Sequence, residues 1–454
     1  MLERPPIASK EESSQALETA FAISSIYTNS QEVANNAYAE IREVNADYPY
    51  WDKVKFIKTT SNLDNRILWF ALRYLRRSTE TSLDFGKYAF SFNVTDEMLE
   101  LLHYFDMNIG GNLTGEQIIP SENKNAYLIS STMEEAIASS QMEGAATTRK
   151  VAKDMLRKNE KPKGKGQQMI LNNYLTIDYI KERSKEDFTV ERLKEIHRSM
   201  TTHTLDDEND AGNIRQHNNI FVMDGITGEI AHQPPHYKEL ETLLVDLEKF
   251  FNHNSAPFIH PIIKAIIVHF MLSYSHPFVD GNGRTARSLF YWYMIKQGYW
   301  LVEYMSISRI ISKTKKQYEN AFLYTEFDNN DLTYFILYNL RKMKVAFEEL
   351  KLYLKRKETE SNSILLLANI KGINQRQAQM IKIVQEKPNT SFSVKEIENR
   401  FSISNFTART DLEGLVSLGY LSEIQLNKVK RNYIKSDRFD SLLKEKVVPL
   451  ALCI

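Results

Sequence analysis

Cysteine is almost missing from this sequence: the chain has one, at position 453, among 454 residues. With a single thiol no disulfide can form within the chain, which favours a reducing compartment. That residue stands next to last rather than fourth from the end, so the sequence lacks a prenylation signal. The first fifteen residues are charged and polar and lack the apolar core of a signal peptide. We therefore expect a cytoplasmic protein.

The sequence also lacks an excess of charge and a long hydrophobic run. Lys plus Arg and Asp plus Glu number 58 each, so no overall field attracts nucleic acid or an anionic membrane. The longest apolar stretch, 261–274, is interrupted by Lys264 and His269 and is too short to span a bilayer. We expect no membrane partner. The 42% of hydrophobic and 26% of charged residues are typical of a globular protein, and the length suggests about three domains.

Helical periodicity dominates what is present. Apolar residues recur every three to four positions in 262–274, which predicts a buried helix. Further helices are expected at 14–40, 62–78, 94–106, 132–143, 189–203, 237–252, 286–294, 306–325 and 331–357. Strand signals are few, and the clearest predicts a hairpin in 219–232. The sequence therefore favours a mainly α fold.

The pattern changes near residue 356. The polar stretch 355–363 is interpreted as a linker, and 158–168, rich in Lys, Gly and Pro, as a surface loop. After the linker, helices are expected at 374–386, 393–400 and 404–418, followed by a β-ribbon at 420–435. Three helices and a ribbon are the order of a winged helix-turn-helix domain.

Polar chemistry is concentrated in residues 276–287, HPFVDGNGRTAR. Gly281 and Gly283 permit a tight turn in which an anion can approach backbone N–H groups at the start of a helix. Arg284 and Arg287 are three residues apart and so share one face of that helix. Two guanidinium groups beside a nest of amides predict a site for several phosphates.

The same stretch offers a metal ligand and a base. Asp280 precedes the turn and is placed to hold Mg²⁺ against phosphates, because hard oxygen ligands suit that ion. His276 is the group in this stretch that can accept a proton near neutral pH. A metal, a phosphate cradle and a base together indicate nucleotidyl or phosphoryl transfer onto a hydroxyl.

Other interpretations of these residues are weaker. The spacing Gly281-x-Gly283-x-x-Ala286 matches a loose dinucleotide-binding pattern, but that pattern follows a strand and here a helix is expected before it. Zinc binding by His276 and Asp280 would need further His or Cys ligands at suitable spacing, and none is found. A plain glycine turn between two helices does not account for the Asn, the carboxylate and both arginines.

The stretch resembles the signature of the Fic family, H-P-F-x-[D/E]-G-N-G-R-x-x-R, at all nine specified positions. The resemblance extends over roughly 120–345 and includes AGNIR (211–215), the hairpin and SISRI (306–310). It implies a Fic-type helical core with a β-hairpin flap. It also implies transfer of AMP from ATP to a Ser, Thr or Tyr hydroxyl of a target protein.

The resemblance further implies roles for individual residues. His276 would deprotonate the target hydroxyl, and Asp280 would hold the Mg²⁺ that bridges the α- and β-phosphates. Arg284 would contact the β-phosphate and Arg287 the γ-phosphate. The phosphates would be cradled by Asn282 and by the amides of Gly281 and Gly283.

Two positions bear on the choice of nucleotide and reaction. The family branch that acts as a kinase has Lys at the second glycine of the turn, so Gly283 favours the AMP-transferring form. Tyr318 would lie on the adenine side of the nucleotide. Where the family often has a Tyr-Tyr pair, this sequence has Tyr318-Glu319, so nucleotide selectivity stays open.

A second motif lies upstream. Ser131 and Glu134 form a capping-box pattern that predicts a helix at 132–143, with Gly144 as its C-terminal cap. Glu143 would then sit at the negative end of this helix, where a carboxylate is better placed beside an external cation. Ser139-x-x-x-Glu143-Gly144 resembles the Fic inhibitory motif [S/T]-x-x-x-E-[G/N]. In that group the Glu pairs with the second Arg of the signature, here Arg287, which implies autoinhibition.

Partners follow from the remaining features. A hairpin with an open edge can pair with an extended segment, so a protein substrate is expected to dock on the flap, 219–232. From Lys395 to Asp440 there are eight Lys/Arg and seven Asp/Glu, a difference of +1, which leaves DNA or a protein as partner of the winged helix. The sequence leaves the oligomeric state open, a homodimer included.

The domains expected are an N-terminal helical region (1–115), a Fic core (116–355) and a winged helix-turn-helix domain (364–440). The leading function is Mg²⁺-dependent AMP transfer from ATP, held back by Glu143. Two alternatives stay open: removal of AMP from a modified target, and a DNA-bound regulator whose Fic core senses nucleotide.

Overall fold

The computed structural model describes residues 2–23, 30–110, 124–225, 227–253, 257–401, 403–425 and 431–443. The chain divides into two compact units, Met1–Glu348 and Glu349–Ile454, called here the N-terminal and the C-terminal unit. The domain boundaries expected at 115 and 355 stay predictions. Among the described residues, no helix is long and apolar enough to cross a membrane.

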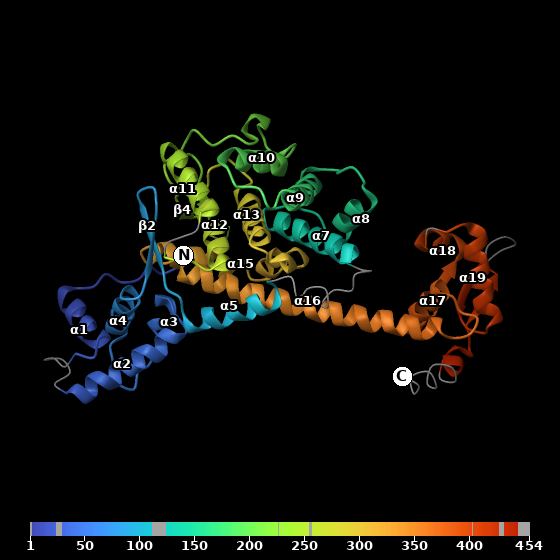
Figure 1. Ribbon diagram of the computed structural model, residues 1–454, viewed down its shortest axis with the longest axis horizontal. Helices are drawn as coiled ribbons and strands as arrows, with labels where there is room; N and C mark the ends of the chain where they lie inside the picture. Colours follow the sequence, from blue (N-terminus) through green and yellow to red (C-terminus); the bar gives the residue numbers. More distant parts are fainter. Residues whose placement is uncertain are drawn as a thin grey trace. The chain divides into compact units, whose positions relative to one another are not determined.

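Two adjoining helices, α12 (Pro261–Ser275) and α13 (Asn282–Lys296), form the centre of the N-terminal unit (Figure 1). Nearly every residue of α12 is buried, which confirms the buried helix predicted for 262–274. His260 caps α12, since its Nδ1 accepts the Ile262 N–H at 3.3 Å. Residues 276–281 connect the end of α12 to the start of α13, so the packing of this pair positions the motif.

Helices from both sides of the sequence surround this pair, and the mainly helical fold is as predicted. Before the pair come α7 (Lys124–Met142), α8 (Arg149–Lys158), α9 (Lys165–Glu182), α10 (Val190–Thr201) and α11 (Leu240–Asn252), with the short η2 (Glu208–Asp210) and η3 (Tyr237–Glu239). After it come η4 (Trp300–Tyr304), α14 (Ile307–Lys313), α15 (Lys315–Phe327) and α16 (Thr333–Ala368). The N-terminal end adds α1 (Lys10–Ala20), α2 (Gln31–Ala46), α3 (Trp51–Val54), α4 (Asn65–Arg77) and α5 (Asp96–Asn108).

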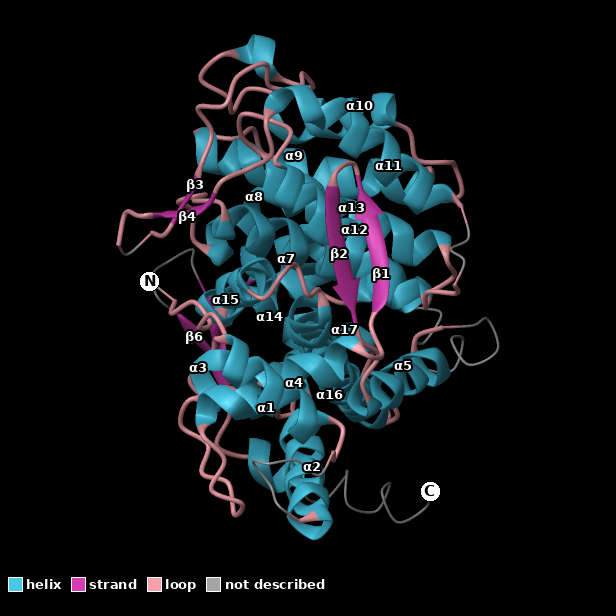
Figure 2. Cartoon of the chain, turned by 90° about the vertical axis from the view of Figure 1, so that its left-hand side faces the viewer, coloured by secondary structure: helices cyan, strands magenta, loops and turns pink. Residues whose placement is uncertain are grey.

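Strands of the N-terminal unit form small antiparallel hairpins (Figure 2). One pairs β3 (Val222–Met223) with β4 (Ile230–His232), which confirms the predicted hairpin. The other pairs β1 (Thr81–Phe85) with β2 (Tyr88–Phe92) and was not predicted. Its signal is present in the sequence as alternating apolar residues on either side of a Gly-Lys turn.

Several predicted helix boundaries were wrong. The capping box at Ser131 does not exist, because α7 already begins at Lys124. Ser131 lies inside the helix and its hydroxyl donates to Tyr304 O at 2.8 Å. Glu134 instead forms an ion pair with Arg149. Tertiary contacts of α7 thus replaced the local capping interaction that the pattern suggested.

Polar composition also misled the prediction of breaks between helices. The supposed linker 355–363 belongs to α16, since the stretch contains no Pro or Gly that would end a helix. The loop predicted at 158–168 is confined to 159–164, because α8 ends and α9 begins within it. The segments expected at 14–40 and 306–325 are each two helices rather than one.

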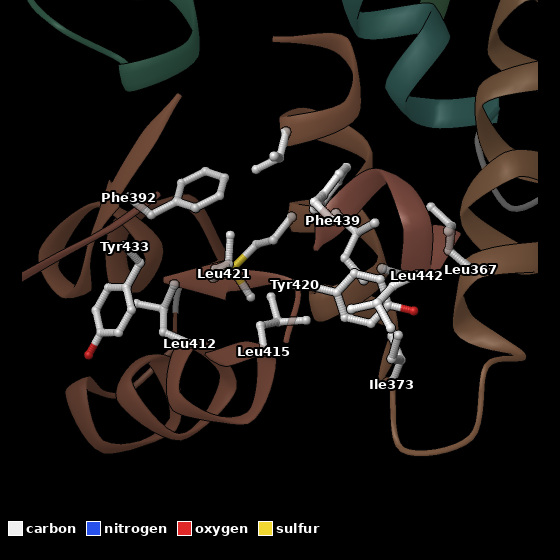
Figure 3. Packing of buried hydrophobic residues seen from close by; sticks show 14 of the residues in the cluster. Leu367, Ile373, Phe392, Leu412, Leu415, Tyr420, Leu421, Tyr433, Phe439 and Leu442 are labelled. Atoms are coloured by element: carbon white, nitrogen blue, oxygen red, sulfur yellow. The ribbon is translucent and has the colours of Figure 1, made fainter. Parts of the chain in front are cut away.

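The C-terminal unit contains the three helices predicted for it, α17 (Gln375–Glu386), α18 (Val394–Phe401) and α19 (Asn405–Ser417). The ribbon is formed by β6 (Leu421–Gln425) and β7 (Arg431–Lys435), and β5 (Ser391–Ser393) completes a sheet of order β5-β7-β6. Its core is shown in Figure 3 and includes Phe392, Leu412, Leu415, Tyr420, Leu421, Tyr433 and Phe439. Lys428 and Lys430 of the ribbon lie outside the described residues.

Within this unit, a buried carboxylate joins the start of α17 to α19. Asp411 of α19 accepts hydrogen bonds from Asn374 Nδ2 at 2.7 Å and from Arg376 Nε and Nη2 at 2.6 and 3.2 Å. Such a pair is costly to break from one side, because the remaining charge loses its partner.

We expect Asp411→Ala to lower the free energy of unfolding of the C-terminal unit by about 2 kcal/mol, because Arg376 and the Asn374 amide lose their acceptor. Denaturant unfolding followed by circular dichroism measures the change. Glu396→Ala is the matched control, since it removes an exposed ion pair with Arg400 and should cost less than about 0.5 kcal/mol. Equal losses in the two variants would contradict the structural role given to Asp411.

Candidate active site

The loop between α12 and α13, residues 276–281, is called the motif loop. His276 ends α12 in a left-handed conformation with a φ of 46°. Gly281 precedes α13 with a φ of 81°. A Cβ at Gly281 would lie 2.7 Å from Thr201 Cγ2, so neither the conformation nor the space admits a side chain.

The side chain of Asn282 closes the motif loop. Its Oδ1 accepts the Phe278 N–H at 2.9 Å, and its Nδ2 donates to Phe278 O at 2.8 Å. The resemblance implied that this side chain would cradle phosphate, but both of its polar atoms already pair with the backbone. The predicted cradle therefore rests on backbone amides and on the positive end of α13.

Arg284 is a buried cation with incomplete hydrogen bonding. Its side chain is 0% exposed, and its Nη1 donates to Met200 O at 3.1 Å. Its Nε and Nη2 have no hydrogen-bond partner among the described residues. The Asp280 carboxylate, half exposed, lies 4.0 Å from Nη2, and burial lowers the pKa of Arg284. Two nitrogens without a partner on a buried guanidinium suit an anionic ligand.

Arg287, in contrast, makes hydrogen bonds through both Nε and Nη2. Its side chain is 4% exposed and holds the C-terminal end of α7 through three hydrogen bonds. Nε donates to Ser139 Oγ at 2.8 Å, and Nη2 donates to Ser139 O at 3.0 Å and to Glu143 Oε1 at 2.8 Å. The ion pair of Glu143 with Arg287 that the resemblance implied is therefore present. Gly144 follows with a φ of 92°, as expected for the cap after α7.

The Glu143 carboxylate occupies the start of α13. It lies so close to Gly283 that a Cβ on this glycine would overlap Oε1. Burial alone would raise the pKa of Glu143, but the charges of Arg287 and Arg284 and the hydrogen bond from Arg287 bring it below its usual value. A carboxylate thus stands where helix dipole and guanidinium groups favour an anion.

His276 has the protonation state that a base requires. Its Nδ1 lies 3.2 Å from Ser273 O, which can only accept, so Nδ1 carries the proton and Nε2 the lone pair. Burial lowers the pKa of His276 to about 4, although the Ser273 contact opposes the shift. The imidazole is therefore neutral at pH 7.

A pocket with a volume of about 200 Å³ opens beside His276. Five of the residues singled out from the sequence line it: Glu143, His276, Gly283, Arg287 and Tyr318. Further lining comes from the hairpin (Val222, Met223, Asp224, Ala231, His232) and from α15. Asp280, Gly281, Asn282 and Arg284 are not part of this lining.

Other parts of the pocket are fixed by contacts that the sequence did not reveal. Tyr318 OH pairs with His269 Nε2 at 2.9 Å, and burial raises the pKa of Tyr318. The hairpin is tied to α15 by Lys316 and Asp224, 3.0 Å apart, and by His232 and Glu326, 2.8 Å apart. These contacts hold the hairpin over the pocket.

Two further side chains hold the motif loop and were not assigned a role from the sequence. Arg215 is buried, and its Nε donates to His276 O at 2.9 Å and its Nη2 to Pro235 O at 2.6 Å. Arg215 belongs to the AGNIR segment, so its position was singled out although its contacts were not. His197 of α10 bonds the Asp280 carbonyl, and no pattern around it indicated this.

Within the part of the chain that the structure describes, no group of three or more His, Cys, Asp or Glu could hold a metal ion. A single carboxylate is nevertheless compatible with Mg²⁺, which is often bound by one or two carboxylates together with substrate phosphates. Asp280 is exposed and adjoins both the free N–H groups of Arg284 and the start of α13. The donor set therefore fits a metal that arrives with phosphates.

Comparison with known proteins places a family match over this site. Residues 187–294 match the model of the Fic/DOC family. The chain is 33% identical over 132 residues to "Protein adenylyltransferase Fic" of Drosophila melanogaster and 31% identical over 132 residues to that of Drosophila willistoni. The matches cover 29% of this chain and 25% and 24% of those proteins. The chain thus spans about a quarter of the length of the curated relatives it matches.

Solved structures were also compared. A Fic family protein from Desulfovibrio desulfuricans matches with a TM-score of 0.48 and 17% identity, over 76% of this chain and 97% of that one. Fic-1 from C. elegans matches with a TM-score of 0.44 and 19% identity, over 78% of this chain and 94% of that one.

We expect Glu143→Gln to destabilise the N-terminal unit at pH 7 by about 1–2 kcal/mol, because Arg287 stays buried without its anion. The folded-state pKa of Glu143 is lowered, so its stabilisation is present above its usual pKa and disappears as pH falls through the folded value. The difference between native and variant melting temperatures should therefore shrink toward pH 3.

Glu191→Gln serves as the control, since it removes an exposed ion pair with Lys194 and should change stability by less than about 0.5 kcal/mol. Calorimetric melting between pH 3 and pH 8 makes the comparison. A Glu143→Gln effect that does not vary with pH would rule out the ion pair as its cause.

Proposed function

We propose, from the premise that the chain is a Fic/DOC family protein distantly homologous to protein adenylyltransferase Fic, that it transfers AMP from ATP to a protein hydroxyl. The observation that carries the proposal is the arrangement around the start of α13. Buried Arg284 and Arg287, the helix end and a neutral His276 lie together, and a carboxylate already occupies the anion position. Such a set is suited to binding phosphates beside a base.

The reaction requires a base at the attacking oxygen. The Nε2 lone pair of His276 would take the proton of a Ser, Thr or Tyr hydroxyl as its oxygen forms a bond to the α-phosphorus of ATP. The bond from the α-phosphorus to the bridging oxygen breaks, and pyrophosphate leaves with the electron pair. The products are the AMP-modified protein, pyrophosphate and a proton held at first by His276.

The phosphates would be held by several groups of this chain. The Gly283 amide and the start of α13 offer N–H donors, whereas the Gly281 N–H already donates to Asp280 Oδ1. Arg284 offers Nε and Nη2, which have no partner among the described residues. Asp280 would hold Mg²⁺, and the ion, when bound, would neutralise part of the phosphate charge.

Glu143 would hold this activity back. It pairs with Arg287, the second cation of the site, and its carboxylate fills the space beside Gly283. A phosphate and Glu143 cannot both occupy that space. While Glu143 is in place, Arg287 Nη2 donates to Glu143 and to Ser139 O and is not available to a phosphate. ATP bound in the presence of Glu143 would therefore lack one phosphate contact and be poorly aligned for attack.

The hairpin is the proposed docking surface for the target. Phe221, Met223 and Ile230 are exposed on it. The hairpin has two short strands, β3 and β4, and main-chain pairing with an extended segment would add a third strand beside the pocket. Such pairing would bring a hydroxyl near His276 without a strict sequence requirement.

For the C-terminal unit, we propose a winged helix-turn-helix with a protein as partner. The three helices and three-stranded sheet fit that domain. On α19, the helix that would read DNA, Phe406 is 80% exposed, and the exposed Arg409 is offset by Glu413. An exposed aromatic residue on a helix without excess positive charge favours a protein surface over a phosphate backbone.

We expect His276→Ala to lower AMP transfer by about 10²- to 10⁴-fold, because a positioned general base contributes a factor of that size. ATP affinity should change little, since the base acts on the attacking hydroxyl. Transfer of labelled AMP and calorimetric ATP binding measure the two quantities. His103→Ala, which removes an exposed imidazole on α5, is the control and should retain full activity. Unchanged transfer in His276→Ala would exclude this residue as the base.

We expect Glu143→Gly to raise turnover by about 10- to 100-fold, because one charge-assisted contact worth roughly 1.5–3 kcal/mol becomes available to ATP. Arg287→Ala on this background should cancel the gain, since both changes act on one contact. Glu160→Gly, on the exposed loop after α8, is the control. A double variant that stays fully active would refute the inhibitory role. Loss of AMP release from a modified target in Glu143→Gly would favour the reverse reaction instead.

A further inference from the structure

His197 is buried in α10 and spans the gap between two loops. The residue is 0% exposed. Nδ1 accepts the Gly212 N–H at 2.9 Å, and Nε2 lies 2.7 Å from the backbone oxygen of Asp280, 83 residues away in the sequence. The ring stacks on Phe278 with 3.7 Å between ring centroids and 5° between planes. Each polar atom of the imidazole thus has one partner.

These partners fix the tautomer. A backbone N–H can only donate, so Nδ1 of His197 must be the unprotonated nitrogen. The backbone oxygen of Asp280 can only accept, so Nε2 must carry the proton and donate it. The two contacts together are satisfied by the neutral ring with its proton on Nε2.

The bond to Asp280 has a consequence for the next amide. In a planar trans peptide the C=O and the following N–H point in opposite directions. Because His197 holds the Asp280 oxygen toward α10, the Gly281 N–H points away from α10. There it donates to Asp280 Oδ1 at 2.5 Å, so the carboxylate lies on that face of the motif loop as well.

We propose that His197 is a positioning residue: by holding the backbone oxygen of Asp280 it orients the Gly281 N–H, and this N–H in turn holds the Asp280 carboxylate in place for a metal that arrives with phosphates. The inference rests on the proposed function. It assigns a role in the site to a side chain that does not itself touch nucleotide. The ring packs closely against Gly281. A Cβ at this position would lie 3.2 Å from His197 Nε2 and 2.7 Å from Thr201 Cγ2, so a side chain there would displace the ring or Thr201.

Substitution of His197 by Asn or by Gln can test its two hydrogen bonds one at a time. The terminal atoms of Asn correspond in reach to Nδ1, and those of Gln correspond to Nε2. His197→Asn would keep an acceptor for Gly212 and lose the donor to Asp280, whereas His197→Gln would keep the donor to Asp280 and lose the acceptor for Gly212. Both variants lose the stacked ring, so they form a matched pair.

The pair is made in the full chain on the Glu143→Gly background, which removes the inhibitory contact. We expect His197→Asn to weaken Mg²⁺-dependent ATP binding, measured by calorimetry, by about 10- to 100-fold, the usual effect of losing a group that orients a metal ligand. His197→Gln should stay within about 3-fold of its parent. The Mg²⁺ concentration that gives half-maximal AMP transfer should rise in His197→Asn and stay close to the parent value in His197→Gln.

The opposite rank order would overturn the proposal, since it would mean that the Gly212 contact is the important one. Equal losses of ATP affinity in the two variants, matched by equal decreases in melting temperature, would also overturn it. His197 would then only contribute to packing. If the parent binds ATP with Mg²⁺ but transfers no AMP, the proposed function fails while the binding comparison still tests His197. If the parent does not bind ATP with Mg²⁺, both fail.

A measurement on the native chain is independent of how the variants fold. Labelling of histidine with ¹⁵N should show His197 as the neutral tautomer with the proton on Nε2 at pH 7, its resonances identified by their loss in His197→Gln. A ring protonated on Nδ1, or on both nitrogens, could not accept the Gly212 N–H and would overturn the proposal.

Discussion

The need for an anion at the start of α13 is the constraint on which the rest of this structure depends. Arg284 and Arg287 are both buried there, beside the positive end of a helix. Concentrated positive charge out of water is unstable without a counter-ion. Glu143 supplies one, reached across 144 residues of sequence by the ion pair with Arg287. The carboxylate stabilises the folded chain in the place where a phosphate would bind.

The same constraint sets folding against activity. Glu143 lowers the energy of the buried cations but denies Arg287 to another anion. Arg284 keeps two nitrogens without partners among the described residues, so the site is only half neutralised. A chain that filled both positions with its own carboxylates would be more stable and would leave no place for phosphate. Partial satisfaction stabilises the fold and leaves polar groups for the anion that the proposed function requires.

The motif loop shows how such a site is kept in shape. Its backbone is held by side chains that approach from three directions: Asn282 from α13, Arg215 from the segment before the hairpin, and His197 from α10. All three bond to main-chain groups of the loop. Gly281 can then take its left-handed conformation, because the surrounding contacts determine where each peptide points.

Sequence alone determined what depends on neighbouring residues. The buried helix at 262–274, the hairpin at 222–232, the helices of the C-terminal unit and the chemistry of HPFVDGNGRTAR follow from periodicity, turn residues and side-chain type. Tertiary structure decided the rest. The contacts that Ser131 makes with Tyr304 and Glu134 makes with Arg149, in place of a capping box, were set by packing. The bond from His197 to Asp280 joins residues 83 apart, and a contact at that separation leaves no periodic trace, because it depends on how helices pack rather than on any local preference.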